Sequence, residues 1–491
     1  MKKILLLTLL FSINTFGQFT DGATIPNFVL NDLNGNQVNL YSLLDQGKIV
    51  MLDFFFPACR PCWDSTIMHS VNDISSKYGE LGSNQIKVYG INVWGEGDGT
   101  VAGNLAAPNI NGVDASNQNF SRGDFEYFAN YKFIPQGSDY GNLVNIIECP
   151  TYLLVGPDRK AYNVNYDDIE YDSENYFGIT LTKIPNNVRI YIPEITTCAT
   201  SNTVNIFAQL RNTGTNNVTS ARVKLMVNNT LLGTQNLTFT GVNNTDSTIG
   251  LNEFSFKNVV IDQPLGTYGK GPYKLVVDMI NGVTLSTPIE KVIKITKEDT
   301  TSSTSNLVVE LQTDFYASDT SWVIYNSNGD VVAQNQSLQN VTTTNQNIAL
   351  QSNSCYTIRL KDTSGDGIDP GYLKLKTAAN SILFDLTMGD YDYENFGYDK
   401  FHSFSTSALS VNENAINQQT YLYPNPAVDK FYLTSADKVS LEISDVCGKL
   451  LKTYNNIDKS NPIDISGLED GVYFVSIIND TESRTIKLMK N

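Results

Sequence analysis

Histidine is almost absent from this chain. Only His69 and His402 occur among its 491 residues, and they lie far apart in the sequence. A histidine-based catalytic triad needs an imidazole beside a nucleophile, and many metal centres take several imidazoles. The scarcity of histidine therefore argues against a triad hydrolase and against a multi-histidine metal centre.

Positive charge is scarce as well. The chain has 34 Lys and Arg against 51 Asp and Glu, which gives a formal net charge of −17. Because phosphate backbones attract basic surfaces, we expect no nucleic-acid partner. Hydrophobic residues make up 41% of the chain and charged residues 17%, which is typical of folded domains with neutral polar surfaces. The length is too great for one core and predicts several domains.

Long hydrophobic runs are missing beyond the N-terminus. Two lysines precede an apolar stretch from Ile4 to Ile13, and small residues at Thr15 and Gly17 fit a cut after Gly17. This pattern predicts a secretory signal peptide in residues 1–17. The stretch is too short to span a bilayer comfortably, and no other segment is apolar enough, so we expect no transmembrane segment. The mature protein is expected to be soluble and exported into a disulfide-permissive compartment.

Cysteine occurs six times, and one pair is distinguished by its spacing. Cys59-Arg60-Pro61-Cys62 directly follows an apolar run, residues 49–56, that predicts a buried strand. Residues 63–78 are predicted to be helical. A Cys-x-x-Cys pair between a strand and a helix is typical of a dithiol redox site. Cys59 would then lie at a helix N-terminus, where free N–H groups and the helix dipole stabilise a thiolate.

Each residue of the pair has a predicted role. Cys59 is expected to be the exposed, attacking thiolate and Cys62 the shielded, resolving thiol, joined as a redox-active disulfide. Pro61 suits the first helical turn, and Arg60 adds positive charge beside Cys59. Together these features should lower the pKa of Cys59 from about 8.5 to roughly 3.5–7.5. A structural disulfide or a zinc half-site is the alternative, but zinc needs two further ligands and a second Cys-x-x-Cys is absent.

A carboxylate interrupts the apolar strand. Asp53 lies six residues before Cys59, within the run 49–56. Burial of a carboxylate is costly, so the pKa of Asp53 should rise. A protonatable carboxyl beneath the dithiol could carry the proton to and from Cys62. The alternative is an aspartate near the strand end that contacts solvent.

Three segments together resemble the thioredoxin fold, and more closely its secreted redoxin branch, the AhpC/TSA type. They are residues 22–28, the motif 53–62 and the Pro150-Thr151 pair that precedes the predicted strand 151–155. The resemblance implies a cis Pro150 that faces the dithiol, preceded by backbone that binds the substrate polypeptide. It also implies a thiol–disulfide oxidoreductase that acts on protein thiols or disulfides and needs no cofactor beyond its own disulfide. The residues implied to contact substrate are Cys149, Pro150, Thr151, Arg60 and Pro61.

The chain departs from that resemblance at three places. Arg60 replaces the usual glycine, so the reduction potential cannot be transferred. Residues 95–120 form a large insertion that could cover or extend the substrate groove. Cys149 occupies a position that is seldom cysteine. It is interpreted as a small buried thiol beside the site, with a disulfide to Cys59, or Cu(I) binding together with Cys62, as the alternatives.

Two further observations concern the cysteines. Related peroxidases place a threonine a few residues ahead of a single reactive cysteine. Here residues 56–58 are Phe-Pro-Ala, which argues against a peroxidase. The remaining cysteines, Cys198, Cys355 and Cys447, fall in three different predicted modules and are expected to be isolated buried thiols.

Before residue 187 the sequence also predicts a hairpin turn at the Asn-Gly pair within residues 32–37, a strand at 86–94 and a helix at 124–133. From about residue 187 the helical periodicity ends. Short apolar runs separated by Asn, Thr and Gly turns predict an all-β sandwich in residues 187–299, with strands at 188–192, 204–210, 221–227, 254–261 and 273–279. Parts of this sandwich resemble immunoglobulin-like spacer or adhesion modules. A polar linker is predicted at 298–305, a second β domain at 306–407 and another linker at 408–419.

The second β domain contains three aspartates around a glycine-bearing turn. Asp362, Asp366 and Asp369 supply oxygen ligands of the kind that Ca²⁺ prefers. The spacing lacks the regular ligands and the terminal glutamate of a full calcium loop. An Asx-rich hairpin turn is therefore an equal alternative. The segment resembles an accessory β module that is repeated in secreted Bacteroidetes proteins.

The last 70 or so residues resemble the type A sorting domain of type IX secretion. The resemblance is carried by Tyr423-Pro-Asn-Pro-Ala-Val428 and by the segments 446–449, 468–473 and 485–490. It implies that residues 420–491 form a small β-sandwich that engages the type IX secretion machinery. It also implies export across the outer membrane, followed by removal of the module.

The sequence thus predicts a multidomain chain, with an α/β thioredoxin fold in residues 18–186, immunoglobulin-like all-β sandwich modules and a small sorting domain. The favoured function is a thiol–disulfide oxidoreductase that passes through the periplasm and is secreted or held at the cell surface. The alternative is an extracellular binding or adhesion protein whose thioredoxin-like part is a scaffold with a structural disulfide.

Overall fold

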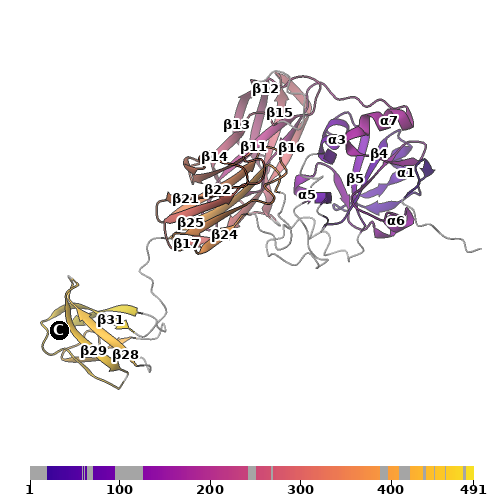
Figure 1. The fold of residues 1–491 in the computed structure, drawn as a ribbon. Helices are drawn as coiled ribbons and strands as arrows, with labels where there is room; N and C mark the ends of the chain where they lie inside the picture. The colour runs from indigo at the N-terminus through magenta and orange to yellow at the C-terminus, as the bar shows by residue number, and fades with distance from the viewer. Residues whose placement is uncertain are drawn as a thin grey trace, which may run out of the picture. The chain divides into compact units, whose positions relative to one another are not determined.

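The chain divides into two compact units, Met1–Ser407 and Ala408–Asn491 (Figure 1). This computed structural model describes residues 19–57, 59, 61–63, 70–93, 125–240, 250–266, 269–386, 396–407, 421–434, 438–446, 448–458, 460–478 and 483–491. The predicted signal peptide, the insertion at 95–120, the linker at 408–419, Arg60 and Cys447 lie outside the described residues.

A six-stranded mixed sheet forms the centre of the first part of the chain. In sheet order the strands are β1 (Ala23–Thr24), β8 (Lys160–Asn163), β7 (Thr151–Val155), β4 (Ile49–Phe55), β5 (Ile86–Asn92) and β6 (Lys132–Ile134). Strands β4, β5 and β6 are parallel to one another. Strand β7 is antiparallel to β4, β8 is antiparallel to β7, and β1 is antiparallel to β8. A separate hairpin pairs β2 (Val29–Asn31) with β3 (Gln37–Asn39) across the predicted Asn-Gly turn.

Helices cover both faces of this sheet. They are α1 (Leu40–Leu44), α3 (Ser70–Tyr78), α5 (Phe125–Phe128), α6 (Ser138–Leu143), α7 (Ile169–Phe177) and the 3₁₀ turn η1 (Tyr166–Asp168). Alternate side chains of β4 serve opposite cores. Leu52 and Phe54 pack with α1 and α6, whereas Ile49 and Met51 pack with α3. The resulting helix–sheet–helix layers are the predicted thioredoxin-like fold.

The predicted elements are mostly confirmed here, with one correction. The strands expected at 49–56, 86–94 and 151–155 are β4, β5 and β7, and the end of the helix expected at 63–78 is α3. The helix expected at 124–133 is wrong beyond its first turn. It ends at Phe128, and Lys132–Ile134 is the edge strand β6, because Phe133 pairs with Gly90 of β5. Short apolar runs do not reveal such a partner.

The first β module is a sandwich of two sheets, as predicted. One sheet has the order β10 (Ile195–Cys198), β16 (Val283–Glu298), β15 (Lys270–Ile280), β12 (Ser220–Val227) and β13 (Thr230–Thr238). The other has the order β14 (Phe254–Val260), β11 (Thr203–Asn212) and β9 (Val188–Tyr191). Buried residues of both sheets form one hydrophobic core, as expected for an immunoglobulin-like module.

The second β module is also a two-sheet sandwich. Its five-stranded sheet has the order β17 (Thr301–Ser302), β25 (Asp399–Thr406), β22 (Ser354–Asp362), β19 (Thr320–Asn326) and β20 (Val331–Gln334). Its four-stranded sheet has the order β21 (Thr343–Ala349), β18 (Asn306–Gln312), β23 (Tyr372–Thr377) and β24 (Ile382–Asp385). The polar linker predicted at 298–305 contains the short strand β17, because Thr301 and Ser302 pair with the end of β25.

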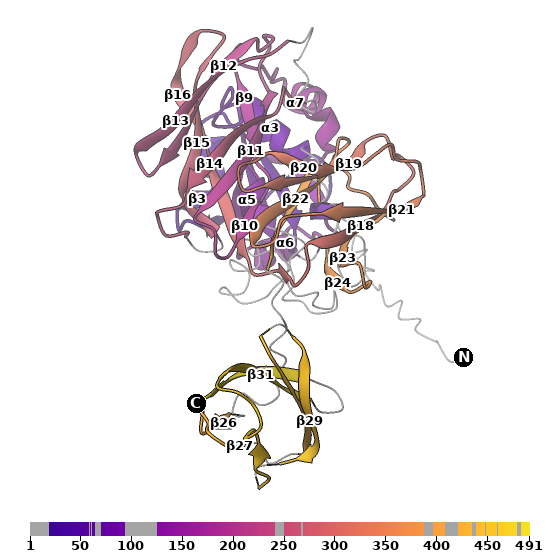
Figure 2. The same cartoon turned by 90° about the vertical axis from the view of Figure 1, so that its left-hand side faces the viewer.

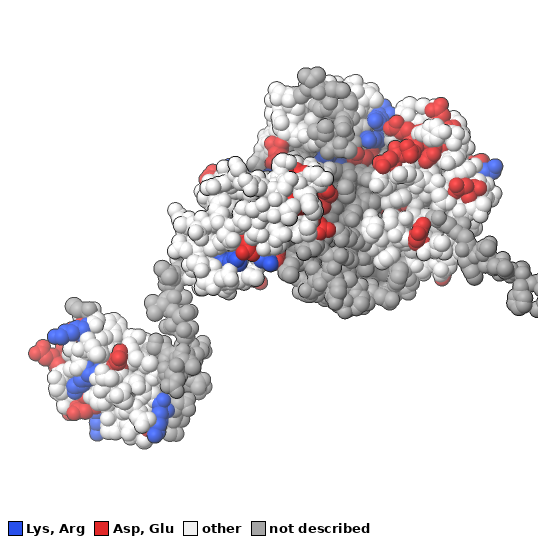
Figure 3. Space-filling model, in the orientation of Figure 1, with Lys and Arg blue, Asp and Glu red and all other residues white. Residues whose placement is uncertain are grey.

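The two sandwiches and the thioredoxin-like part pack together within the first unit. Phe207 of the first sandwich stacks against Tyr325 and Phe401 of the second, with ring centroids 4.8 and 5.4 Å apart. The hydroxyl of Tyr127, on α5, donates to the carbonyl of Pro193 at 3.3 Å. In Figure 2 the sandwiches accordingly lie in front of the thioredoxin-like part. On the face shown in Figure 3, charged side chains are scattered between wide uncharged areas, in line with the low charged fraction.

The second unit is a small sandwich of its own. One sheet has the order β26 (Leu422–Tyr423), β27 (Lys430–Leu433) and β30 (Ile463–Asp464). The other has the order β29 (Leu450–Ile457), β28 (Val439–Ser444), β31 (Gly471–Ile478) and β32 (Ser483–Lys490). Buried side chains of both sheets, among them Phe431, Leu441 and Val475, make up its separate core.

None of the helices in the described part of the chain combines the length and the apolar character that crossing a bilayer requires.

Candidate active site

The Cys-x-x-Cys pair is an oxidised disulfide in this structure. The sulfurs of Cys59 and Cys62 are bonded at 2.03 Å, and the Cα atoms lie 5.3 Å apart. The pair follows the C-terminal end of β4, a central strand of the sheet. Loops at the carboxyl ends of parallel strands are where α/β folds place their chemistry. The two cysteines predicted to form a redox disulfide are therefore joined by a disulfide in this structure.

Backbone N–H groups surround the first sulfur. The N–H of Trp63 donates to the carbonyl of Cys59 at 3.1 Å, and residues 61–63 are helical, so Cys59 lies at the start of a helix. The N–H of Cys62 donates to Sγ of Cys59, also at 3.1 Å. When the bond is reduced, these groups would stabilise a Cys59 thiolate, because an N–H near a helix start favours negative charge.

The disulfide is enclosed by aromatic side chains. Cys59 is 4% exposed and Cys62 2%, so the prediction that Cys59 is openly exposed is wrong for this oxidised state. The pair belongs to an apolar cluster with Phe55 at the end of β4 and Phe125 on α5. Trp63 stacks edge-on against Phe125, with ring centroids 5.1 Å apart. Water is thereby kept from most of the disulfide.

Asp53 lies on the same face of β4 as the dithiol cluster. Successive side chains of a strand point to opposite faces of the sheet. Leu52 and Phe54 point to one face, so Asp53 points to the other, together with Met51 and Phe55. Asp53 is 3% exposed, and burial raises its pKa from 3.8 to about 7, although a hydrogen bond from Tyr131 opposes the shift. The expected rise in pKa is thus present, and the carboxyl can gain or lose a proton near neutral pH.

The shifted pKa of Asp53 predicts a pH-dependent cost to stability. The folded protein binds this proton more tightly than the unfolded chain, so the free energy of unfolding should fall as pH rises from 3.8 to about 7. Asn is neutral and has the same shape. We therefore expect Asp53→Asn to raise the free energy of unfolding at about pH 8 by on the order of 4 kcal/mol, and to leave it unchanged near pH 3.5. Urea denaturation at both pH values measures this, and an equal gain at both would show that packing rather than charge is responsible.

The segment before β7 approaches the first sulfur. The Cys149–Pro150 peptide bond is cis, as the thioredoxin resemblance implied. Sγ of Cys59 lies 3.7 Å from the carbonyl oxygen of Cys149. Thr151 is buried, and its hydroxyl donates to the carbonyl of Glu148 at 2.7 Å. The structure therefore brings Cys149, Pro150 and Thr151 to the dithiol, whereas Pro61 is an exposed residue of the helix start.

The thiol of Cys149 is free and half-buried. It packs against the apolar cluster of the dithiol. Burial, together with the smaller effects of the Asp53 and Glu148 charges, raises its pKa to about 12. A thiol with this pKa stays protonated at neutral pH and is a weak nucleophile and a weak metal ligand. The geometry thus favours the interpretation of Cys149 as a small buried thiol.

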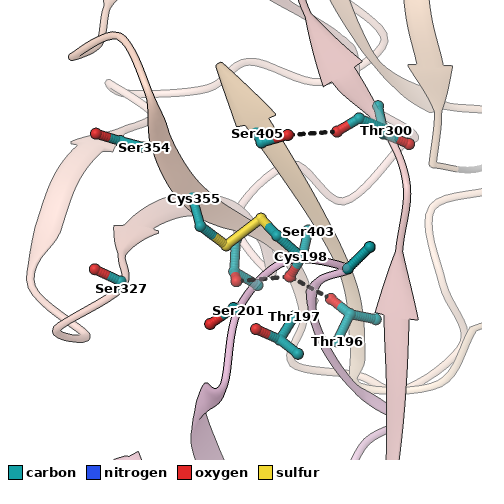
Figure 4. The surroundings of a disulfide bond; sticks show 12 residues. Thr196, Thr197, Cys198, Ser201, Thr300, Ser327, Ser354, Cys355, Ser403 and Ser405 are labelled. Carbon is teal, nitrogen blue, oxygen red and sulfur yellow. Dashed lines mark hydrogen bonds between the residues drawn. A yellow bond between two sulfur atoms is a disulfide. The ribbon is translucent and has the colours of Figure 1, made fainter. Parts of the chain in front are cut away.

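The remaining cysteines require a correction. Cys198, at the end of β10, and Cys355, at the start of β22, form a disulfide with an S–S distance of 2.13 Å, so they are not isolated thiols (Figure 4). The bond joins the first sandwich to the second. Beside it the hydroxyls of Thr196 and Ser403 lie 2.8 Å apart, again between the two modules. Local sequence cannot predict a disulfide between cysteines that are 157 residues apart. The available signal was that an exported chain, in which disulfides can form, has one cysteine in each of the two sandwiches.

The aspartates of the second sandwich are engaged by backbone. The carboxylate of Asp362 accepts hydrogen bonds from the N–H groups of Gly365 and Gly367 at 2.6 and 3.0 Å, which is an Asx-type turn. Asp366 and Asp369 are exposed. Within the described ranges, no group of three or more His, Cys, Asp or Glu side chains is arranged to hold a metal ion. Ca²⁺ binding stays a prediction.

One residue of the site was missed by the sequence analysis. The hydroxyl of Tyr131 donates to Oδ2 of Asp53 at 3.0 Å, although the two residues are 78 positions apart. Tyr131 falls in the segment that was expected to be helical. No local pattern marks it, since only the pairing of β6 with β5 brings it to the carboxyl.

Comparison with known proteins places the C-terminal module. Residues 421–491 match the family described as "Secretion system C-terminal sorting domain", which confirms the resemblance seen in the sequence. A search of curated proteins finds no match for the chain.

Solved structures similar to this chain include three disulfide-exchange proteins. The thioredoxin domain of a thiol-disulfide oxidoreductase from Bacteroides vulgatus is 20% identical, over 32% of this chain and 99% of that one, with a TM-score of 0.23. A thiol:disulfide interchange protein from Bacteroides sp. is 19% identical, over 33% and 92%, with a TM-score of 0.20. A secreted Mycobacterium tuberculosis disulfide oxidoreductase is 17% identical, over 29% and 90%, with a TM-score of 0.21.

The chain carries a thioredoxin-like fold with a Cys-x-x-Cys disulfide at its N-terminal end and a secretion-system sorting domain, marking it for export, at its C-terminal end.

Proposed function

We propose that this protein is a secreted thiol–disulfide oxidoreductase that acts on protein thiols or disulfides through Cys59 and Cys62. The observation that carries the proposal is the Cys59–Cys62 disulfide at a helix start, with the N–H of Cys62 on Sγ of Cys59. A merely structural disulfide needs no hydrogen bond to one of its sulfurs, no buried acid beneath it and no cis-proline segment beside it.

The proposed reaction is two successive thiol–disulfide exchanges. The Cys59 thiolate attacks one sulfur of a substrate disulfide, which forms a mixed disulfide and releases the other substrate sulfur as a thiolate. Cys62 then loses its proton to Asp53 and attacks Sγ of Cys59, which releases the second substrate thiolate. The substrate gains two electrons and the Cys59–Cys62 pair loses two. The reverse sequence oxidises a substrate dithiol.

The surface near the cis-proline segment suits an extended polypeptide. Leu143 and Ile147, a few residues before Cys149 in the chain, are 64% and 61% exposed. Exposed apolar side chains next to a reactive group favour contact with another chain. The carbonyl of Cys149, 3.7 Å from Sγ of Cys59, would accept a backbone hydrogen bond from a polypeptide that lies across the disulfide.

The test is to trap the mixed disulfide. In the full-length Cys62→Ser variant, Cys59 can open one disulfide of insulin but no resolving thiol follows. The second interchain disulfide still joins the two insulin chains, so we expect a covalent adduct with the mass of one insulin molecule. Reductant should remove the adduct, and Cys59→Ser should form none. Mass spectrometry of the intact protein reads the result. The proposal fails if the Cys62→Ser protein forms no adduct while its Cys59 is shown to be present as a free thiol.

A further inference from the structure

A tyrosine joins the buried acid of the site to a cavity. The hydroxyl of Tyr131 donates to Oδ2 of Asp53 at 3.0 Å. Asp53 is fully enclosed, whereas Tyr131 is only partly buried. The ring of Tyr131 packs against both the α3 core and the cluster that holds the dithiol. Tyr131 therefore lies between the enclosed carboxyl of Asp53 and the more exposed residues around it.

The two oxygens of the Asp53 carboxyl differ in their surroundings. Oδ2 is held by Tyr131, but Oδ1 is buried without a hydrogen-bond partner among the residues that the structure describes. An unpaired carboxyl oxygen in an apolar interior is costly unless it has a use. Because Tyr131 occupies Oδ2, Oδ1 is the carboxyl oxygen left for a second partner on the face of β4 that carries Phe55 of the dithiol cluster.

A cavity of about 250 Å³ lies on the same side of the sheet. It is formed by the C-terminal half of α3, by β5 and by residues 130–132, with Tyr131 in its wall. Ser75, Lys87 and Lys132 are among its polar lining residues. A polar space of this size holds several water molecules, each of which needs such hydrogen-bond partners.

We propose that Tyr131 is the proton link between Asp53 and water in this cavity, and so a positioning residue for the reaction proposed above. To protonate Asp53, the hydroxyl hydrogen of Tyr131 moves to Oδ2 while a hydronium ion in the cavity supplies the replacement hydrogen and becomes water. In the reverse direction the carboxyl turns until the oxygen that took the proton from Cys62 faces Tyr131. This hydrogen then moves to the tyrosine oxygen while the hydroxyl hydrogen of Tyr131 moves to a cavity water, which becomes hydronium. Neither direction changes the oxidation state of any group, and the tyrosine is regenerated.

The hydrogen bond also sets how readily Asp53 gives up its proton. Tyr131 donates to the carboxylate and stabilises the charged form, which opposes the effect of burial on the pKa of Asp53. Without this donor the carboxyl would stay protonated to higher pH. Cys62 would then lack a base at neutral pH, and the resolution step would slow.

The first test follows the carboxyl directly and needs no turnover. In the full-length protein labelled with ¹³Cγ-aspartate, the Asp53 resonance is assigned by its absence in Asp53→Asn, and its titration midpoint is measured by NMR. Tyr131→Phe should raise the midpoint by about one pH unit. Tyr89→Phe, which removes the hydroxyl of another tyrosine of the cavity wall, should leave it unchanged. An unchanged midpoint in Tyr131→Phe overturns the proposal.

The second test follows the proton in single-turnover resolution of the mixed disulfide. Tyr131→Phe should slow this step about tenfold at pH 7, and imidazole, which is small enough for the cavity, should restore the rate in proportion to its concentration. Wild type and Tyr89→Phe should not respond to imidazole. A Tyr131→Phe rate equal to wild type, or slow but insensitive to imidazole, contradicts a proton link. Absence of any turnover in wild type would instead refute the proposed function, while the carboxyl titration would still report on Tyr131.

Discussion

Replacing Cys59 by serine is expected to abolish the reduction of insulin disulfides, leaving only the rate of dithiothreitol alone. The thiolate is the nucleophile of disulfide exchange, and a serine hydroxyl is neither ionised at neutral pH nor able to form a mixed disulfide. We assign this role to Cys59 because its Sγ accepts the N–H of Cys62 and lies 3.7 Å from the carbonyl oxygen of Cys149. The measurement is insulin turbidity at neutral pH with the purified full-length protein.

Cys149→Ser is the matched control for this loss. It removes a thiol from the same apolar cluster but from a group whose burial raises its pKa to about 12, so most of the turnover should remain. Circular dichroism should show that both variants are folded. Equal turnover by wild type and Cys59→Ser would refute the oxidoreductase and leave the disulfide a structural one.

Removing the Cys198–Cys355 bond is expected to lower the free energy of unfolding of the first unit by about 5 kcal/mol. The bond closes a loop of 157 residues, and the chain entropy that a disulfide removes from the unfolded state grows with loop length. The double variant Cys198→Ala/Cys355→Ala tests this, because it leaves no single thiol to form a wrong pair. Urea denaturation without reductant, followed by tryptophan fluorescence, gives the free energy.

The location of the Cys198–Cys355 bond predicts which contacts its removal affects. It joins β10 to β22, beside the Thr196–Ser403 hydrogen bond and near the ion pairs of Arg359 with Glu253 and Asp399. Those contacts should still hold the sandwiches together at low urea, so the native spectrum should persist. Cys149→Ala, which removes a free thiol, should cause a much smaller change. A double variant with the wild-type midpoint would mean that the bond does not form in the exported protein.

The two results would be independent of each other. Loss of the Cys198–Cys355 bond leaves the helix start at Cys59 untouched, and Cys59→Ser leaves both sandwiches intact. A variant that loses insulin turnover and keeps its stability therefore separates the chemistry of the site from the cohesion of the sandwiches.

Local sequence patterns identified the Cys-x-x-Cys pair, the fold class and the export module. Cys59 and Cys62 are three residues apart, a spacing that suits a helix start, and the apolar residues of β4 by themselves predict a buried strand. The sorting domain is recognised from short motifs because each forms a turn or strand within 71 residues. Asp53 could be identified as a buried acid because it interrupts an apolar run.

Only the tertiary structure decided the partners that lie far away in the chain. The disulfide of Cys198 with Cys355, the hydrogen bond of Tyr131 to Asp53 and the strand β6 each join segments that are dozens of residues or more apart. Such pairs leave no periodic trace, since the free energy that forms them comes from packing and loop closure rather than from neighbouring residues. The residues proposed to carry the chemistry could therefore be identified from local sequence. The contact of Tyr131 with Asp53 and the disulfide between the two sandwiches could be identified only from the fold.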